Sequence, residues 1–398
     1  MRALIAHNHY GDRATGGEET VFNNETNLLR DKGIEVETFE RSNIELANFP
    51  LRKKISAACS FRFQDVREDA TRIIRRFRPD ILHVHNYKFV FSTAVFEAAR
   101  DLGVGIVLSI HNYRLLCPGG QLRRGAVPCE ECLHRNPVRS LWRKGCASSF
   151  FFRALQYSFY RNTRDFVKEC VDAFVLPTRF AKEKFLTAGF PEEKLFVKPY
   201  FLFDPKTELQ SVESFRFFPR QAVFVGRLSE EKGIRLLIDA WRDIDYPLVV
   251  VGDGPDRERV SAFASSNVRF LGNRPSKETL QIIGASDFLV FPSVCYEGLG
   301  MTLLEAFAMG VPVVASNLGS RREIVGDGET KAGLLFESGD RDSLKQAVLE
   351  LTTRLEQRRK YGEAARKRYE LFYSPERNYQ QLIQIYQSII DRKKCSRL

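Results

Sequence analysis

The sequence lacks any hydrophobic run long enough to cross a membrane, since no stretch approaches the ~18 uncharged apolar residues that a spanning helix needs. Its first residues, MRALIAHNHYGD, hold only a short apolar run before polar residues, which is typical of a first strand and not of a signal peptide. Short repeats and low-complexity tracts are also absent. We therefore expect a cytoplasmic globular protein whose eight cysteines stay reduced.

The length and the strand pattern indicate two domains. A chain of 398 residues is too long for one ordinary core, and strand-like runs alternate with helical patterns as in α/β proteins with parallel sheets. The alternation pauses near 201–219 and then restarts. This predicts two Rossmann-like domains that face each other across a cleft, with ligands at the carboxyl ends of the strands.

The positive charge is concentrated in one segment. The net charge is +11, and residues 114–168 carry eleven Lys and Arg against three Asp and Glu. The same segment contains SSFFFRALQYSFY (148–160), in which basic and aromatic residues alternate. Such a pattern suits an anionic membrane surface or a nucleic acid. It equally fits a helix that buries its aromatic face and leaves its charges in water.

Two cations follow the first strand pattern of the second half. In VGRLSEEKG (225–233) the strand ends at Gly226, Arg227 comes next, and Lys232 precedes a helix. The planar arginine fork and the lysine point charge suit two adjacent phosphates. The spacing alone also fits two solvated surface cations.

Glycines and glutamates surround a helix predicted over 301–309. Gly298 and Gly300 come immediately before it, so that a phosphate can approach the free amides of the helix N-terminus. Glu297 lies in the preceding loop and Glu305 lies one turn into the helix. Carboxylates accept hydrogen bonds from vicinal hydroxyls, which suits a hydroxyl-rich ligand. The alternative is a capping Glu297 and a solvated Glu305.

These segments together resemble a known family. GRLSEEKG followed by FPSVCYEGLGMTLLEAFAMGVPVVAS is similar to the family 4 retaining glycosyltransferases of the GT-B fold, whose E-x7-E motif is matched by Glu297 and Glu305. The early TGGEE and the central IHN extend the resemblance over most of the chain. It implies an acceptor domain at 1–203, a donor domain at 204–373, and a C-terminal helix within 374–398 that packs back on the N-terminal domain.

The resemblance also implies roles for residues of the second half. Arg227 and Lys232 would hold the diphosphate of a UDP- or GDP-sugar, Glu297 would contact the hydroxyls of the donor sugar, and Glu305 would contact the ribose. Arg274, in LGNRPS, would help to hold the base. The remaining donor contacts would come from the backbone of Gly298, Gly300, Met301, Thr302 and Leu303.

In the first half, the candidates are a glycine pair and a histidine. Gly16 and Gly17 precede a helix and suit a donor diphosphate or an acceptor phosphate, although they also fit a simple turn. All six histidines lie within residues 1–134, and most are expected to be core residues. By the resemblance, His111 faces the donor sugar as a catalytic group, with Asn112 beside it.

The resemblance implies a hexosyltransferase that needs no cofactor for catalysis. Since no carboxylate nucleophile is evident, retention implies front-face attack, in which the leaving diphosphate helps to deprotonate the acceptor. Arg227, Lys232 and the helix dipole would stabilise the developing charge. The D-x-D formed by Asp243 and Asp245 precedes a strand and is interpreted as surface.

Four cysteines form a candidate metal site. Cys117, Cys129, Cys132 and Cys146 are spaced C-x11-C-x2-C-x13-C, which suits a structural zinc with four thiolates, and His134 is an alternative ligand. Buried thiols and a redox pair remain open alternatives.

The expected setting is the synthesis of a bacterial capsule, exopolysaccharide or lipopolysaccharide. The acceptor would be a saccharide or a polyprenyl-linked saccharide, with the protein peripheral on the inner face of the cell membrane. One alternative is another GT-B enzyme acting on a soluble acceptor. A nucleic-acid-binding protein with a zinc site is disfavoured, because the basic charge is confined to one insert while the motifs suit a diphosphate and a diol.

Overall fold

The structure, a computed structural model, describes residues 1–11, 16–58, 63–125, 127–146, 149–207 and 212–395. It divides into two compact units. The first unit comprises residues 1–125, 129–199 and 378–398, and the second comprises residues 200–377 with the short segment 126–128. The sequence places the corresponding boundaries at 203/204 and 373/374.

The first unit is built on a six-stranded parallel sheet of order β2-β1-β3-β4-β7-β8. Its central strands β3, β4 and β7 are buried along their whole length, as expected of a parallel sheet covered by helices on both faces. The strands are β1 (Arg2–His9), β2 (Glu35–Ser42), β3 (Ile81–Asn86), β4 (Gly105–Ser109), β7 (Ala173–Leu176) and β8 (Leu195–Val197).

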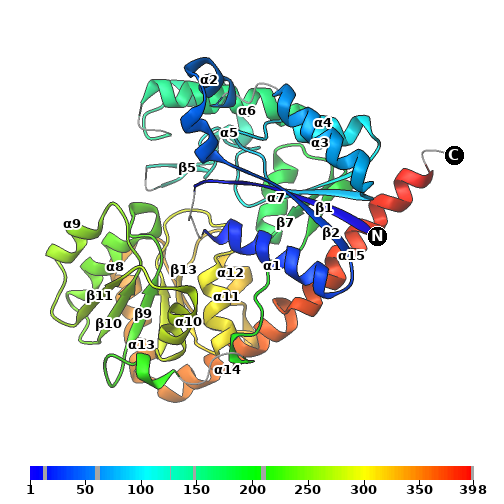
Figure 1. Cartoon of the computed structure of the whole chain (residues 1–398). Helices are drawn as coiled ribbons and strands as arrows, with labels where there is room; N and C mark the ends of the chain where they lie inside the picture. Colours follow the sequence, from blue (N-terminus) through cyan, green and yellow to red (C-terminus); the bar gives the residue numbers. More distant parts are fainter. Residues whose placement is uncertain (12–15, 59–62, 126, 147–148, 208–211, 396–398) are drawn as a thin grey trace. The chain divides into compact units, whose positions relative to one another are not determined.

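The helices and short elements of this unit include the end of the chain. They are α1 (Gly17–Asp31), α2 (Leu51–Ala58), α3 (Gln64–Phe77), α4 (Ala94–Asp101), α5 (Glu131–His134), α6 (Phe150–Cys170), α7 (Arg179–Thr187), α15 (Pro375–Cys395), η1 (Asn43–Asn48), η2 (Pro137–Leu141), η3 (Glu192–Lys194) and β5 (Arg123–Arg124). Leu382, Ile385, Tyr386 and Ile389 of α15, red in Figure 1, pack with β1, β3, β4 and β7 in one core. The expected return of the C-terminal helix to the N-terminal domain is thus confirmed.

The second unit repeats the design with the strand order β11-β10-β9-β12-β13-β14. Its strands are β9 (Ala222–Val225), β10 (Leu248–Val251), β11 (Val268–Gly272), β12 (Phe288–Phe291), β13 (Val313–Ser316) and β14 (Gly333–Phe336), with β6 (Val127–Pro128) apart from the sheet. Its helices are α8 (Ile234–Trp241), α9 (Arg257–Ala262), α10 (Ser276–Gly284), α11 (Met301–Met309), α12 (Arg321–Val325), α13 (Arg341–Thr353) and α14 (Leu355–Phe372), and its 3-10 turns are η4 (Pro205–Thr207), η5 (Glu213–Phe215), η6 (Glu230–Lys232) and η7 (Gly328–Thr330).

Two Rossmann-like parallel sheets were the expected fold, and the structure confirms them. Each sheet places its polar loops beyond the carboxyl ends of its strands. In the second unit the strand order reverses between β9 and β12, so the loops after these two strands flank the topological switch point.

Candidate functional site

The loops after β9 and β12 bring together the two charged residues that the sequence singled out. Lys232, at the end of η6, donates from Nζ to Oε1 of Glu297 over 2.7 Å. The hydroxyl of Ser293 donates to the same oxygen over 2.8 Å. Burial acts to raise the pKa of Glu297, but the charges of Lys232 and Arg321 and these hydrogen bonds outweigh it and lower the pKa. Glu297 is therefore an ionised carboxylate at neutral pH.

A glycine allows these two loops to approach each other. Gly233 follows Lys232 with φ +72°, and a Cβ atom there would lie 2.0 Å from the carbonyl oxygen of Pro292. Only glycine tolerates both the left-handed backbone and this contact. The glycine that follows Lys232 therefore lets the loop that carries this lysine come close to the loop that carries Glu297.

A buried arginine supports the loop after β12. The sequence did not predict a role for this residue. Arg321, at the start of α12, is fully buried and donates from one nitrogen to the carbonyl oxygens of Ser293 (2.9 Å) and Cys295 (2.8 Å). The hydroxyl of Ser316 also donates to the Ser293 carbonyl, over 2.6 Å. These contacts hold the chain just before Glu297. An arginine at a helix start gives no distinctive signal in the sequence, because most such residues are exposed.

Helix α11 begins after Gly300, whose φ of +89° turns the chain into the first helical residue, Met301. The first amides of a helix have no acceptor in the preceding turn, so this end suits an anion. Leu303 already donates its amide to the Gly300 carbonyl (3.0 Å), which leaves Met301 and Thr302 as the better placed donors.

Glu305, one turn into α11, contrasts with Glu297. In the described part of the chain no side chain hydrogen-bonds to its carboxyl group or pairs with it. Burial raises the pKa of Glu305 to about 7. A half-buried carboxyl without a partner is costly in the folded protein, and a ligand hydroxyl would offset that cost.

Two further predicted cations lie at the same end of the sheet. Arg227 follows Gly226 after β9 and has an exposed side chain. Arg274 follows β11, is exposed, and stands 3.8 Å from Glu278 of α10. Asp243 of the D-x-D lies elsewhere, paired with Arg341 over 2.5 Å at the surface.

In the first unit His111 lies beyond the carboxyl end of β4, stacked on His85 of β3. Nε2 of His111 is 3.2 Å from Nδ1 of His85. Burial, together with the positive charges nearby, lowers the pKa of His111 to about 3, so its imidazole is neutral at physiological pH. His111 can therefore exchange a neutral hydrogen bond with a sugar hydroxyl.

Behind this histidine pair lies a buried ionic network. Glu25 of α1 and Lys198, just after β8, form a hydrogen-bonded ion pair in which both side chains are 1% exposed. The other carboxylate oxygen of Glu25 lies 3.5 Å from Nε2 of His85. Lys198 also donates to the side-chain oxygen of Asn378 on α15 (3.2 Å). The chain of contacts runs from Lys198 through Glu25 and His85 to His111.

A second histidine ties the network to the C-terminal helix. His83 stands 2.7 Å from the Tyr386 hydroxyl of α15 and 2.8 Å from the Ser109 hydroxyl of β4. Burial lowers the pKa values of His83 and His85 well below the usual value. Both nitrogens of the neutral His83 ring are held, and Nδ1 of the neighbouring His85 ring lies 3.2 Å from His111, so this network positions His111.

The remaining predicted residues of this unit lie near the start of α1. Gly16 caps the helix, and Gly17 is its first residue; both are exposed, with open space where a Cβ atom of Gly16 would lie. The side-chain oxygen of Asn112 accepts from the Arg114 amide over 3.2 Å.

The four cysteines of the insert lie in the same unit and influence one another. A hydrogen bond with Cys132 lowers the pKa of the Cys117 thiol to about 6. Among the described residues, sets of three ligand atoms within 4.8 Å of one another occur at His7, His9 and Glu19 and at Glu25, His83 and His85, and not at the cysteines. The four-thiolate site therefore stays a prediction.

The first turn of α6 exposes aromatic rings. Phe150, Phe151 and Phe152 are 55%, 61% and 55% exposed, and Trp142 after η2 is 68% exposed. Arg153 joins the two elements by donating to the Leu141 carbonyl over 2.7 Å. Further along, α6 buries Phe159, Tyr160, Thr163 and Val167. The helix thus has features of both alternatives. Its C-terminal part buries aromatic side chains in the core, and its first turn exposes them.

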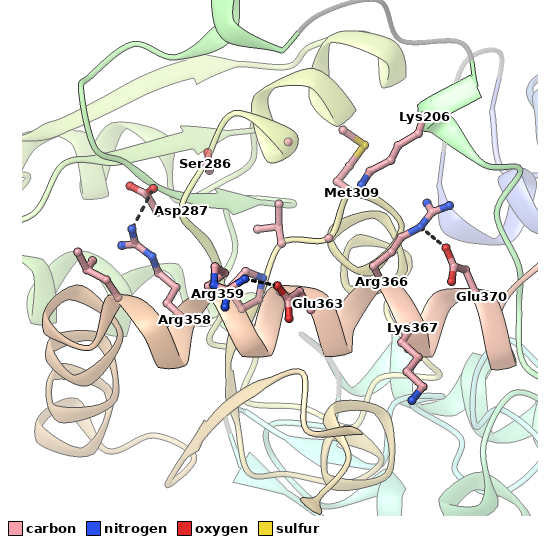
Figure 2. Close-up of a pocket in the computed structure, with 16 residues that line it drawn as sticks. Lys206, Ser286, Asp287, Met309, Arg358, Arg359, Glu363, Arg366, Lys367 and Glu370 are labelled. Atoms are coloured by element: carbon pink, nitrogen blue, oxygen red, sulfur yellow. Dashed lines mark hydrogen bonds and ion pairs between the residues drawn. The ribbon is translucent and has the colours of Figure 1, made fainter. Parts of the chain in front are cut away.

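A hollow along α14 lies apart from these residues (Figure 2). Ser286 and Val311, which line it, come just before β12 and β13, at the amino ends of the strands. Arg358 pairs with Asp287 (3.4 Å), and Arg366 pairs with Glu370 (2.6 Å). Because these arginines are neutralised within the protein, we assign the hollow a structural role.

Two protein-family models match the chain. The model described as Glycosyltransferase Family 4 matches residues 15–200, and the model described as Glycosyl transferases group 1 matches residues 207–368. Together they cover most of the sequence.

Curated relatives match less than half of this chain. An uncharacterized glycosyltransferase of Methanocaldococcus jannaschii, MJ1178, is 34% identical over 173 residues, 42% of this chain and 48% of the relative. The O-antigen chain mannosyltransferase C of Escherichia coli is 27% identical over 176 residues, 43% of this chain and 47% of the relative. The matched part thus spans about half the length of these relatives.

Solved structures share the fold over nearly the whole chain. Sucrose-phosphate synthase from Thermosynechococcus elongatus has a TM-score of 0.72 at 18% identity, covering 98% of this chain and 100% of the other. Anabaena HepE, solved in complex with UDP and glucose, has a TM-score of 0.67 at 18% identity, covering 97% and 99%. At this identity the likeness establishes the fold alone.

Proposed function

This chain belongs to the group 1 glycosyl transferases of glycosyltransferase family 4, and we propose that it transfers a sugar from a nucleoside-diphosphate sugar to a saccharide or lipid-linked saccharide, with retention of configuration. The observation that carries the proposal is the pairing of Lys232 with an ionised Glu297 in the loop that leads to α11, whose Glu305 lacks a partner among the described residues. The first unit would receive the acceptor.

The donor would lie beyond β9 and β12 of the second unit. Arg227 and Lys232 supply positive charge for the diphosphate, and the first amides of α11 supply backbone donors. Glu297 would accept hydrogen bonds from the sugar hydroxyls and Glu305 from the ribose. Because Glu297 already balances the charge of Lys232, bound diphosphate would draw Lys232 away and leave the carboxylate to the sugar.

The reaction would follow from this placement. The bond from the anomeric carbon to the diphosphate oxygen breaks, the acceptor oxygen bonds to that carbon on the same face, and the acceptor proton passes to the departing diphosphate. Lys232, Arg227 and the α11 dipole would stabilise the charge on the diphosphate. His111, held neutral and oriented by His85, would hydrogen-bond a hydroxyl of the reacting sugar.

A thermal-shift screen tests the donor site. UDP, GDP, ADP and their glucose or mannose conjugates are added one at a time, since a ligand stabilises the folded protein it binds. Nucleotides that carry one of the three bases should raise the melting temperature of the wild type but not that of the Arg227→Met variant. No shift with any nucleotide at millimolar concentration would contradict the donor site.

We further propose that the acceptor is lipid-linked and that the first unit docks on an anionic membrane surface. No helix in the described parts of the chain is long and apolar enough to span a bilayer. The exposed rings of Phe150, Phe151 and Phe152 begin α6, which contacts η2 with its exposed cation Arg139, a combination that suits the headgroup region. The similarity to the O-antigen chain mannosyltransferase C of Escherichia coli supports an acceptor of the O-antigen type.

Changing Phe150, Phe151 and Phe152 together to serine should weaken binding to phosphatidylglycerol vesicles at least ~tenfold, because three aromatic side chains no longer leave water. Vesicle co-sedimentation measures the effect. Phe263→Ser, which removes a ring that is 64% exposed in the second unit, is the matched control and should bind like the wild type. Equal binding by the triple variant, or binding insensitive to salt, would refute the docking surface.

We also propose a structural zinc held by Cys117, Cys129, Cys132 and Cys146. Elemental analysis of protein purified without chelator should find about one zinc per chain, because tetrahedral thiolate sites bind zinc tightly. The double variant Cys129→Ser, Cys132→Ser should lose it, while Cys395→Ser, at an exposed thiol, should keep it. A wild type free of zinc would leave the cysteines as thiols only.

A further inference from the structure

A small pocket of the first unit opens beside His111. It lies beyond the carboxyl ends of β3 and β4, and all of its lining residues belong to this unit. Its polar lining includes Glu18, Asn86, Lys88, His111, Asn112 and Arg114. Its position next to His111, outside the second unit, places it on the acceptor side of the proposed reaction.

Two cations line the pocket. The backbone of Lys88 is fixed, since its amide donates to the side chain of Asn86 (3.0 Å) and its carbonyl accepts from Asn8 (2.7 Å). Its ammonium lies over the ring of Phe89, 4.5 Å from the centroid. Arg114 donates to the Tyr10 hydroxyl over 2.7 Å, which leaves further guanidinium nitrogens for a ligand.

The negative charge nearby only partly neutralises these cations. In the described part of the chain no carboxylate pairs with Lys88, and Glu18 is the only acidic residue that lines the pocket. Burial raises the pKa of Glu18 to about 7, so its carboxyl group is only partly ionised at neutral pH. The Oε1 atom of Glu18 is buried and has no hydrogen-bond partner among the residues that the structure describes.

The position of Lys88 is electrostatically unfavourable in the absence of a ligand. Burial, followed by repulsion from Arg114, lowers the pKa of Lys88 to about 7. An anion between the two side chains would remove the repulsion and restore full charge on the lysine. Such a group would be held by a point charge and a planar fork, a pairing suited to tetrahedral or planar oxyanions.

We infer that the pocket formed by Lys88, Arg114 and Asn112 binds an anionic group of the acceptor, a phosphate or a carboxylate, next to His111. The identification of the bound group as part of the acceptor rests on the proposed function. The anion site itself is argued only from the residues that line the pocket. It narrows the acceptor from any saccharide to one that carries a negative charge close to the hydroxyl that reacts.

Sulfate binding tests the site directly, because sulfate keeps two negative charges across neutral pH. The titration is done by calorimetry in the presence of saturating UDP, so that the second unit's cations are occupied. Lys88→Met should weaken sulfate binding at least ~tenfold, the size expected for one lost charged hydrogen bond. Lys88→Arg, which keeps the charge, should retain most of it.

Lys394→Met, which removes an exposed lysine of the same unit, is the matched control and should bind sulfate like the wild type. Circular dichroism shows that each variant is folded before it is compared. Equal sulfate affinity in the wild type and Lys88→Met would overturn the inference, as would equal loss in Lys394→Met, which would reveal a general charge effect.

The pH dependence supplies a second readout. As pH rises from 6 to 8, Lys88 loses its proton and Glu18 gains charge, and both changes disfavour an anion. His85 and His111 face the pocket but stay neutral over this range, and Arg114 stays charged. Sulfate affinity should therefore fall as pH rises through about 7 in the wild type, and it should fall less in Lys88→Met, where only Glu18 still titrates. A pH-independent affinity would contradict the site.

Two ligands distinguish the two possible sources of the anionic group. Glucose 6-phosphate represents a soluble sugar phosphate, and farnesyl phosphate in neutral detergent micelles represents a lipid-linked phosphate. Binding of either that depends on Lys88 supports the inference and names the source; binding of neither, with sulfate also unbound, overturns it. Lys88-dependent binding in a protein that transfers no sugar would defeat the proposed function while leaving the anion site intact.

Discussion

Replacing Lys232 with methionine should lower kcat/KM for sugar transfer by about 10²- to 10³-fold, the loss expected when one preorganised charge at the leaving group is removed. Among the described residues, Lys232 is the cation that hydrogen-bonds to Glu297, and the proposed donor site assigns its charge to the diphosphate. Since its charge acts mainly as the diphosphate departs, kcat should fall more than KM rises. Steady-state kinetics of nucleoside diphosphate release measures both.

The same kinetic experiment includes a variant of the partner residue, Glu297, and a control variant. Glu297→Gln should also lower kcat/KM strongly, and the double variant should lose less than the product of the single losses, because the two residues share one interaction. Lys367→Met removes an exposed lysine of α14 that lines the hollow at the amino ends of the strands, and it should leave the rate unchanged. A Lys232→Met protein as active as the wild type would refute the donor assignment.

Replacing Glu25 with glutamine should destabilise the first unit by about 3–5 kcal/mol, because Lys198 would remain as an uncompensated charge in the core. Hydrogen exchange of peptides from β3 and β4 reports the stability of this unit by itself. Activity should also fall, since His85 loses the carboxylate that orients it behind His111.

A second substitution separates charge from packing. The double variant Glu25→Gln, Lys198→Met should recover part of the lost stability, because it removes the buried charge as well as its partner. Recovered stability with activity still low would identify the pair as positioning residues for His111. Glu183→Gln, at an exposed site on α7, should change neither quantity. A Glu25→Gln protein with unchanged exchange rates would contradict the buried ion pair.

The sequence predicts the fold well, because parallel strands are buried on both faces and read as continuous apolar runs. β3 was expected at 81–86 and α11 at 301–309, and both are observed with these bounds. β14 was missed although Gly333–Phe336 carries a short apolar run, since it follows helical and turn residues without a clear break.

The site was only partly predictable from the sequence. Lys232 and Glu297 stand out because both lie beside glycines at strand ends. The network behind His111 does not, because Lys198 and Tyr386 meet their partners across 173 and 303 residues, and no local pattern records such contacts. A lysine inside the apolar run LFVKPY was the one local sign that a buried partner exists.

The central claim is that this chain moves a sugar from a nucleoside diphosphate to an acceptor while keeping the anomeric configuration. Proton NMR of the wild type with the nucleotide sugar chosen by the thermal-shift screen tests it most directly. We expect nucleoside diphosphate to form together with a product whose anomeric coupling matches that of the donor, and neither to form with Glu297→Gln. Inverted anomeric coupling, or no diphosphate from folded protein with any donor, would contradict the account.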